Sequence, residues 1–205
     1  MSINSPVVLI IYKRPELTNL VFNRISKVKP EKFFIIADGP KGDNEEEDCL
    51  RARKVVENID WDCEVKRNYS DINLGCRQRV SGGLNWVFSH VEDAIILEDD
   101  CLPDLSFFDF CKTLLEYYRY DTRIWMISGN NFQNSHQKRE SSYYFSYYPH
   151  CWGWATWRRA WENYDDSLRK WSEFKDGRIL NSLFQDSTEV DYWEDILSCL
   201  AETGQ

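Results

Sequence analysis

Residues Ala94 to Asp100 read AIILEDD, an unbroken apolar run followed by three acidic side chains. The run does not alternate apolar with polar residues, so it predicts a strand that is covered on both faces. Glu98, Asp99 and Asp100 come directly after it, where adjacent carboxylates repel one another unless a cation offsets their charge. This stretch therefore joins a buried strand to a candidate cation site.

Similar apolar runs recur along the chain. Val7–Ile11, Phe33–Ala37 and Ile124–Ile127 show the same lack of alternation. A weaker candidate, Cys63–Asn68, does alternate and is predicted to lie nearer an edge of the sheet. Buried, non-alternating strands are typical of a parallel sheet with helices on both faces.

Helical patterns separate these runs. One helix is predicted after Pro15, which suits a first helical turn, and another from Asn44 to Asn58, with Asn44 as its cap. The next has an apolar face, and a fourth is predicted to open at Asp104. That apolar face consists of Leu84, Val87, Phe88 and Val91. Strands that alternate with helices predict a Rossmann-like α/β fold with three layers, α/β/α, and a mainly parallel central sheet.

Size and charge narrow the function classes. At 205 residues the chain is long enough for one substantial core and too short for two comfortable domains, so residues 1–205 are predicted to form a single domain. A formal net charge of -9 argues against a surface that grips a phosphate backbone. Nucleic acid is therefore not an expected partner.

The cysteines and the N-terminus bear on location. The seven cysteines form no CxxC pair and fall mostly in apolar segments, which indicates buried free thiols of a reducing compartment. The N-terminus lacks the charged and apolar regions of a secretion signal, and no stretch approaches the length of a membrane span. A cytoplasmic protein without a transmembrane segment is expected, while peripheral membrane contact stays open.

Polar side chains follow three of the buried runs. Tyr12 and Arg14 come after the first, Asp38 after the second, and Glu98–Asp100 after the third. Because parallel strands end at one edge of the sheet, we expect these groups to meet in one crevice. Each has a plainer alternative: an ordinary turn for Asp38, a solvated residue before a helix for Arg14, and an acidic turn before the next helix for the third group.

Two ligand chemistries are predicted at this edge, a divalent cation and an anion. Mg²⁺ or Mn²⁺ takes a few carboxylate oxygens and completes its shell with water and phosphate oxygens. The segment NLGCRQR, which begins at Asn73, leads into a predicted helix and brings Arg77 and Arg79 near its N-terminus. The N-terminus of a helix favours anions, although a solvated loop would account for the same residues.

The last third of the chain changes character. The stretch Asn130–Ser142 is predicted to be a mobile polar loop, and the segment Tyr143–Tyr164 holds nine Trp and Tyr residues. Aromatic walls of this kind suit a sugar or nucleoside pocket. Further on, Glu194 and Asp195 lie on a predicted helix, where an acid could act as general base. Surface acids of an amphipathic helix explain the same pattern.

With these residues in hand, the chain resembles the GT-A glycosyltransferases, in particular the N-acetylglucosaminyltransferase I type and its bacterial sugar-transferase relatives. The stretch Leu97–Phe110, LEDDCLPDLSFFDF, resembles that family's acidic metal motif followed by a Phe-rich helix. The resemblance implies a GT-A fold in which Asp100 binds Mn²⁺ or Mg²⁺. It places Glu98 and Asp99 near the ribose and phosphates of the donor.

The same resemblance assigns nucleotide-binding residues. Tyr12 and Arg14, in the motif after the first strand, and Asp38, after the second, match positions that bind the nucleotide, usually uridine. Arg77 is a further candidate for the phosphates. By this division residues 1–129 form the nucleotide-sugar-binding half and residues 130–205 the acceptor-side half.

On the acceptor side, Asp195 resembles the base of the family's late motif, with Glu194 in reserve. The segment CWGWATW resembles the stretch that lines donor sugar and acceptor, and it contributes Trp152, Gly153 and Trp154. The chain departs from the animal enzyme in its length, in the lack of a membrane anchor and in the shortened region after the base. The identity of the acceptor therefore does not transfer.

The implied activity is metal-dependent transfer of a sugar from a nucleotide-diphosphate donor, by resemblance a UDP-sugar, to a hydroxyl of a saccharide or glycolipid. One candidate base, with no second carboxylate placed as a nucleophile, predicts inversion at the anomeric carbon. The alternatives are a sugar nucleotidyltransferase and a non-catalytic nucleotide-sugar-binding module. A nucleotidyltransferase is expected to carry a Gly-rich phosphate-binding signature directly after the first strand. This sequence has YKRPE at that place.

Overall fold

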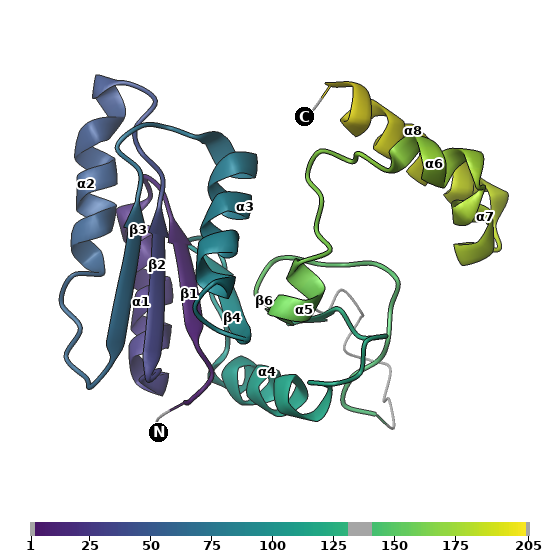
Figure 1. The fold of residues 1–205 in the computed structure, drawn as a ribbon. Coiled ribbons are helices and arrows are strands. Elements are labelled where there is room, and N and C mark those ends of the chain that lie inside the picture. Colours follow the sequence, from purple (N-terminus) through teal and green to yellow (C-terminus); the bar gives the residue numbers. More distant parts are fainter. Residues whose placement is uncertain (1–2, 131–140, 204–205) are drawn as a thin grey trace. The chain divides into compact units, whose positions relative to one another are not determined.

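Residues 3–130 and 141–203 are described by the structure, a computed structural model (Figure 1). They fall into two compact units, residues 1–162 and 163–205. The first unit holds the sheet, and the described part of the second is helical. Most of the predicted loop Asn130–Ser142 lies outside the described residues. That the whole chain acts as one domain, with halves that meet at residue 129, stays a prediction.

A six-stranded sheet forms the centre of the first unit, in the order β3-β2-β1-β4-β6-β5. Four neighbouring strands run parallel: β3 (Glu64–Tyr69), β2 (Lys32–Ala37), β1 (Val7–Ile11) and β4 (Asp93–Glu98). The last two strands are β6 (Trp154–Trp157), antiparallel to β4, and β5 (Met126–Ser128), antiparallel to β6. This arrangement confirms the predicted α/β fold with a mainly parallel sheet.

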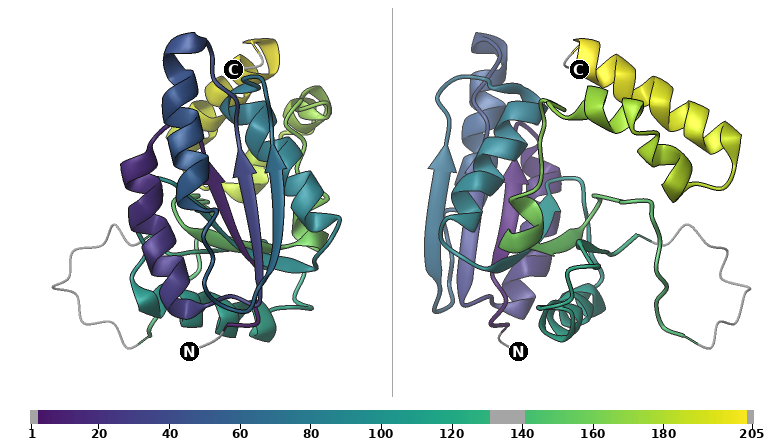
Figure 2. Two further views of the ribbon diagram at one scale, coloured as in Figure 1. Left: turned by 90° about the vertical axis from the view of Figure 1, so that its left-hand side faces the viewer. Right: turned by 45° about the vertical axis from the view of Figure 1, so that its right-hand side comes forward.

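Helices cover both faces of this sheet (Figure 2). The helices of the first unit are α1 (Pro15–Val28), α2 (Glu46–Val55), α3 (Gly75–Phe88), α4 (Leu105–Tyr117) and the short α5 (Arg158–Trp161). α1 and α4 pack on one face of the sheet and α3 packs on the other. The three layers predicted from the sequence are therefore present.

The two faces of the sheet build two separate cores. In β1, Val7, Leu9 and Ile11 belong to the core shared with α1 and α4, whereas Val8 and Ile10 belong to the core shared with α3. Successive side chains of a strand point to opposite faces. A strand covered twice therefore needs an unbroken apolar run, as the sequence has.

The predicted helix boundaries are confirmed at one helix and wrong at another. Asp104 caps α4, and its carboxylate accepts a hydrogen bond from the backbone N–H of Ser106 at 2.9 Å. Asn44 does not cap a helix, because it lies inside the 3-10 helix η1 (Asp43–Glu45). α2 begins only after it, at Glu46, and ends at Val55, so it is shorter than predicted.

The strands beyond β4 differ most from expectation. The run Ile124–Ile127 was expected to be a strand, but β5 starts only at Met126. Its partner β6 was not predicted at all, because it lies inside the aromatic segment and is too short for its period to stand out. Trp157 of β6 is 2% exposed, and its indole Nε1 donates to the Leu115 carbonyl at 3.0 Å. Part of the aromatic segment is thus core.

The second unit contains α6 (Trp171–Asp176), α7 (Ile179–Leu183) and α8 (Ser187–Thr203). Trp171 Nε1 donates to Ser198 Oγ at 3.2 Å. Within the described ranges of both units, no helix is both long and apolar enough to span a bilayer. The seven cysteines are free thiols, but Cys76, Cys151 and Cys199 are exposed, which corrects the expectation of buried thiols.

Candidate functional site

The strand order reverses between β1 and β4. The two strands are neighbours, yet the chain reaches β4 only after passing through β2 and β3 on the other side of β1. In open α/β sheets, ligands bind beyond the carboxyl ends of the strands at such a switch point. The register pairs Ile10 with Glu98, so Tyr12 and Asp99 follow their strands side by side. The predicted polar groups of β1 and β4 therefore meet where a ligand is expected.

Arg14 links the two carboxylates that follow β4. Its Nη1 donates to Asp100 Oδ2 at 2.9 Å, and its Nη2 donates to Asp99 Oδ1. The Asp99 side chain is 2% exposed, against 37% for Asp100 and 44% for Arg14. The backbone N–H of Tyr12 also donates to Asp99, at 3.2 Å. Asp99 is thus a buried anchor, while Asp100 and Arg14 face solvent.

Arg14 offsets the negative charge of the acidic stretch only in part. Burial raises the pKa of Asp99, although Arg14 and the Tyr12 N–H oppose the shift. Burial also raises the pKa of Glu98, and the charges of Asp100 and Asp99 raise it further. Each shift means that the ionised form is disfavoured by its surroundings, and a further cation would reverse that effect.

The residues present fit a metal ion only in part. Carboxylate oxygens are the donors that Mg²⁺ and Mn²⁺ prefer. Among the residues that the structure describes, however, no group of three or more His, Cys, Asp and Glu side chains could hold an ion. Mg²⁺ commonly takes one or two carboxylates and completes its shell with water and substrate phosphates. Asp100 is the exposed carboxylate of this stretch, and its role as a metal ligand stays a prediction.

Asp38 is engaged within the protein. Its Oδ1 accepts from the N–H of Gly39 at 3.0 Å and of Leu74 at 2.9 Å. Its Oδ2 accepts from Asn73 Nδ2 and from the Gly75 N–H, both at 3.1 Å. A carboxylate offers about four acceptor sites, so these donors fill it. Asp38 ties the end of β2 to the loop before α3, and its contact with a nucleotide stays a prediction.

Glu45, which sequence reasoning did not single out, holds the segment after β1. Its carboxylate accepts from Tyr12 Oη, from Lys13 Nζ and from the Lys41 N–H. These donors lower the pKa of Glu45 to about 2, while burial and Glu45 raise the pKa of Tyr12. The Tyr12 hydroxyl is therefore committed to Glu45. The acidic run at residues 45–48 hid this role, because acids are ordinary in a first helical turn.

The arginines near this edge have different environments. Arg77 is exposed on α3. Arg79 is buried instead, and its Nη2 donates to Asn68 Oδ1 at 2.7 Å, so it holds the end of β3. Burial lowers the pKa of Arg79. Arg53 was not recognised by sequence reasoning. Its guanidinium donates to the Asp38 carbonyl at 3.0 Å and so supports the turn that follows β2.

The predicted sugar-side residues are divided between surface and core. Trp152 is exposed, and Gly153 has a φ of 72°, in the left-handed region that favours glycine. The Gly153 carbonyl accepts from the Gly129 N–H at 2.9 Å. Trp154 begins β6 and packs with Trp161 against the core under α3. Trp152 is the member of this group whose side chain faces solvent.

The candidate bases belong to the second unit. Glu194 lies on α8, and its Oε1 is 2.9 Å from Lys175 Nζ. Asp195 is exposed on the same helix. Their roles as base and reserve stay predictions.

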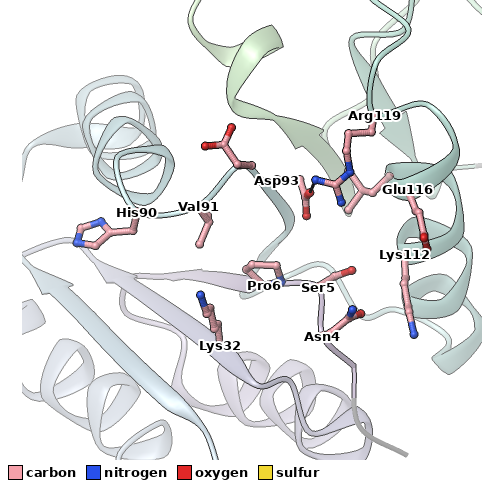
Figure 3. A pocket seen from close by; sticks show the side chains of 12 residues that line it. Asn4, Ser5, Pro6, Lys32, His90, Val91, Asp93, Lys112, Glu116 and Arg119 are labelled. Atoms are coloured by element: carbon pink, nitrogen blue, oxygen red, sulfur yellow. Dashed lines mark ion pairs between the residues drawn. The ribbon is translucent and has the colours of Figure 1, made fainter.

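A polar cavity of about 380 Å³ lies at the amino ends of the strands, opposite the ends that carry the predicted site residues (Figure 3). Pro6, Lys32 and Asp93, at the amino ends of β1, β2 and β4, line it. Figure 3 shows the Asp93 carboxylate directed to the Arg119 guanidinium, 3.1 Å away. None of the predicted site residues lines this cavity, so it is separate from the switch point.

Comparisons with known proteins assign no family to this chain. The sequence matches no protein-family model and no curated protein. One solved structure, a 4-diphosphocytidyl-2C-methyl-D-erythritol synthase from Anaerococcus prevotii, is similar over 76% of this chain and 72% of that chain. The identity is 10% and the TM-score 0.43. A similarity of that size carries no conclusion about this chain.

Proposed function

We propose that the chain binds a nucleotide-diphosphate sugar at the switch point and transfers the sugar to an acceptor hydroxyl. The observation that supports this function best is the contact of Arg14 with Asp99 and Asp100 between the ends of β1 and β4. A diphosphate is bound well by a guanidinium, which donates two parallel hydrogen bonds, and by a cation that a carboxylate holds. The guanidinium of Arg14 and the carboxylate of Asp100 lie here within hydrogen-bond distance of each other.

Each residue then has a distinct task. Asp100 would hold Mn²⁺ or Mg²⁺, which supplies neutralising charge for the leaving nucleoside diphosphate. Arg14 would donate to the phosphate oxygens, and buried Asp99 would orient Arg14. Asp195, with Glu194 in reserve, would accept the proton of the acceptor hydroxyl. Uridine as the base, a UDP-sugar as donor and inversion at the anomeric carbon complete the proposal.

A sugar nucleotidyltransferase is the alternative that the fold leaves open. Such an enzyme transfers the nucleotidyl group of a nucleoside triphosphate to a sugar phosphate and releases pyrophosphate, so it must bind a triphosphate close to β1. The segment Tyr12–Pro15 contains no glycine to bring its backbone near phosphates, and Lys13 is paired with Glu45. These features favour the diphosphate donor.

Calorimetric titration of the protein with UDP, GDP and UTP, with and without Mn²⁺, tests the proposal. We expect UDP to bind in the presence of Mn²⁺ and to lose about 10- to 100-fold in affinity in Asp100→Ala. Asp109→Ala, which removes an exposed carboxylate from α4, is the matched control and should bind UDP like the wild type.

Other outcomes assign the protein differently. UTP binding that exceeds UDP binding, together with binding of a sugar 1-phosphate, would indicate the nucleotidyltransferase. UDP-sugar binding without turnover on any acceptor would indicate a binding module. Failure of all three nucleotides to bind would mean that the acidic stretch is a structural turn.

A further inference from the structure

The cavity at the amino ends of the strands is large enough for a small molecule. Its volume is about 380 Å³, and ligand pockets measure about 300 to 1,000 Å³. The segment before β1, the starts of β2 and β4 and the C-terminal half of α4 surround it (Figure 3). Four parts of the fold that are far apart in the sequence thus contribute side chains to one cavity.

Ser5 brings an unpaired polar group to this cavity. The residue is 8% exposed and belongs to the lining. Its hydroxyl makes no hydrogen bond to any residue that the structure describes. Figure 3 shows the Ser5 side chain directed towards the α4 side of the cavity. Because a buried hydroxyl is costly unless it is hydrogen-bonded, its partner is expected inside the cavity.

The charged side chains around the cavity leave a surplus of positive charge. Three basic and three acidic residues line it: Lys32, Lys112 and Arg119, and Glu92, Asp93 and Glu116. Glu92 is neutralised from outside the lining, since its Oε1 lies 2.6 Å from Arg158 Nη1. With His90 counted as neutral, one positive charge is left over, although the whole chain carries a formal net charge of -9.

The basic groups of the lining keep hydrogen-bond donors for a ligand. Arg119 Nη1 lies 3.1 Å from Asp93 Oδ2, and one carboxylate can take at most two of the five N–H donors of a guanidinium. Lys32 has only a distant partner, Glu64 at 4.0 Å. Lys112 forms no ion pair within the described part of the chain. Guanidinium, ammonium and hydroxyl groups are the donors that bind phosphate and carboxylate oxygens.

We propose that this cavity binds a small organic anion through the phosphate or carboxylate group of that molecule. Lys32, Arg119 and Ser5 hold the anionic group, and the rest of the volume accepts the polar body of the ligand. The site does not depend on the proposed sugar transfer. The five residues of β1, a length of about 16 Å, separate it from the polar groups that follow the carboxyl ends of the strands.

Titration with glucose 6-phosphate, gluconate and glucose in a phosphate-free buffer, followed by the amide NMR shifts of the protein, tests the site. The first two ligands have polar bodies of similar size and differ in the anionic group, while glucose is neutral. We expect one or both anions to shift the amide signals of Ser5, Val91 and Asp93, and glucose to leave them unchanged. The anion that binds more tightly identifies the preferred group.

Three results of that titration would overturn the proposal. Neither anion shifts these signals, glucose shifts them as strongly as the anions do, or the shifts are confined to the residues that follow β1 and β4. The last result would place the anion at the switch point instead of in the cavity.

Lys32→Gln and Lys66→Gln form a matched pair of variants. Both lysines lie close to Glu64, at 4.0 and 3.3 Å, and both substitutions change the net charge equally, but Lys66 does not line the cavity. Lys32→Gln should weaken the binding of the preferred anion about tenfold or more, because a charged hydrogen bond is lost. Lys66→Gln should weaken it less than about twofold, because solvent screens a more distant charge. Equal losses would reveal a general effect of charge and would overturn the proposal.

Discussion

The carboxylates that follow β2 and β4 share the same chemistry but have opposite surroundings. Asp38 accepts from four donors, three of them backbone N–H groups that the fold holds in place. Asp100 accepts from the side chain of Arg14 and, weakly, from the Cys101 thiol. Backbone donors cannot leave without a change of fold, whereas an exposed arginine can rotate away. The end of β2 is thus closed, and the end of β4 is available to a ligand.

The closed end depends on one close approach of the backbone. Gly39 follows Asp38, and a Cβ placed on it would lie 2.5 Å from the carbonyl carbon of Ile72. Only a residue without a side chain lets the loop that carries Asn73 fold back over this turn. At the open end of β4, the chain continues through Cys101 to α4 and leaves Asp100 exposed.

Substitution of Asp38 should break the closed end and have the largest effect. Asp38→Asn replaces an accepting oxygen by an NH₂ group that faces two donors. We expect the free energy of unfolding to fall by about 3 kcal/mol. Asp100→Asn, the same change at the open end, should lower it by less than about 1 kcal/mol. Urea denaturation of both variants measures the difference, and equal losses would contradict the distinction drawn between the two ends.

Substitution of Gly39 probes the close approach itself. Gly39→Ala should lower the free energy of unfolding by about 2 kcal/mol, because the nearby atoms belong to backbone that cannot rotate aside. Gly42→Ala is the control in the same loop: Gly42 has an extended φ of -173°, and its Cβ would lie 3.4 Å from Asn44 Oδ1. That variant should change stability by less than about 0.5 kcal/mol. Thermal denaturation of Gly39→Ala and Gly42→Ala measures the difference in stability. Similar melting temperatures of the two variants would argue against a tight turn at Gly39.

Substitution of Glu45 should give the smallest effect, and one that depends on pH. The pKa of Glu45 falls from 4.5 to about 2 in the folded chain, so its contribution to stability is present above pH 4.5. That contribution is lost as the pH falls from 4.5 towards about 2. At pH 6 the wild type should therefore have a higher melting temperature than Glu45→Gln. This difference in melting temperature should shrink as the pH is lowered below 4.5. A difference that is constant or grows on acidification would contradict the assignment.

Sequence reasoning predicted which polar groups gather after β1 and β4 but not how they are bonded, and their role as a functional site stays a prediction. Arg14, Asp99 and Asp100 were predicted to meet, and the structure brings them into contact. Glu45 and Arg53 were missed, because acids and bases at the two ends of a helix are expected for its dipole alone. Trp154 was expected on a sugar, but β6 places it partly in the core.

The sequence by itself determined the parallel strands, their alternation with helices and the carboxyl ends of the strands as the place where polar groups gather. These features follow from local periodicity, since an unbroken apolar run has few solutions other than a strand covered on both faces. Only the tertiary structure decided which carboxylate is closed and which is open. The deciding bonds join residues far apart in the chain, 35 positions for Asn73 and Asp38 and 86 for Arg14 and Asp100. Local patterns carry no information about such pairs, because the pairs exist only once the strands have assembled.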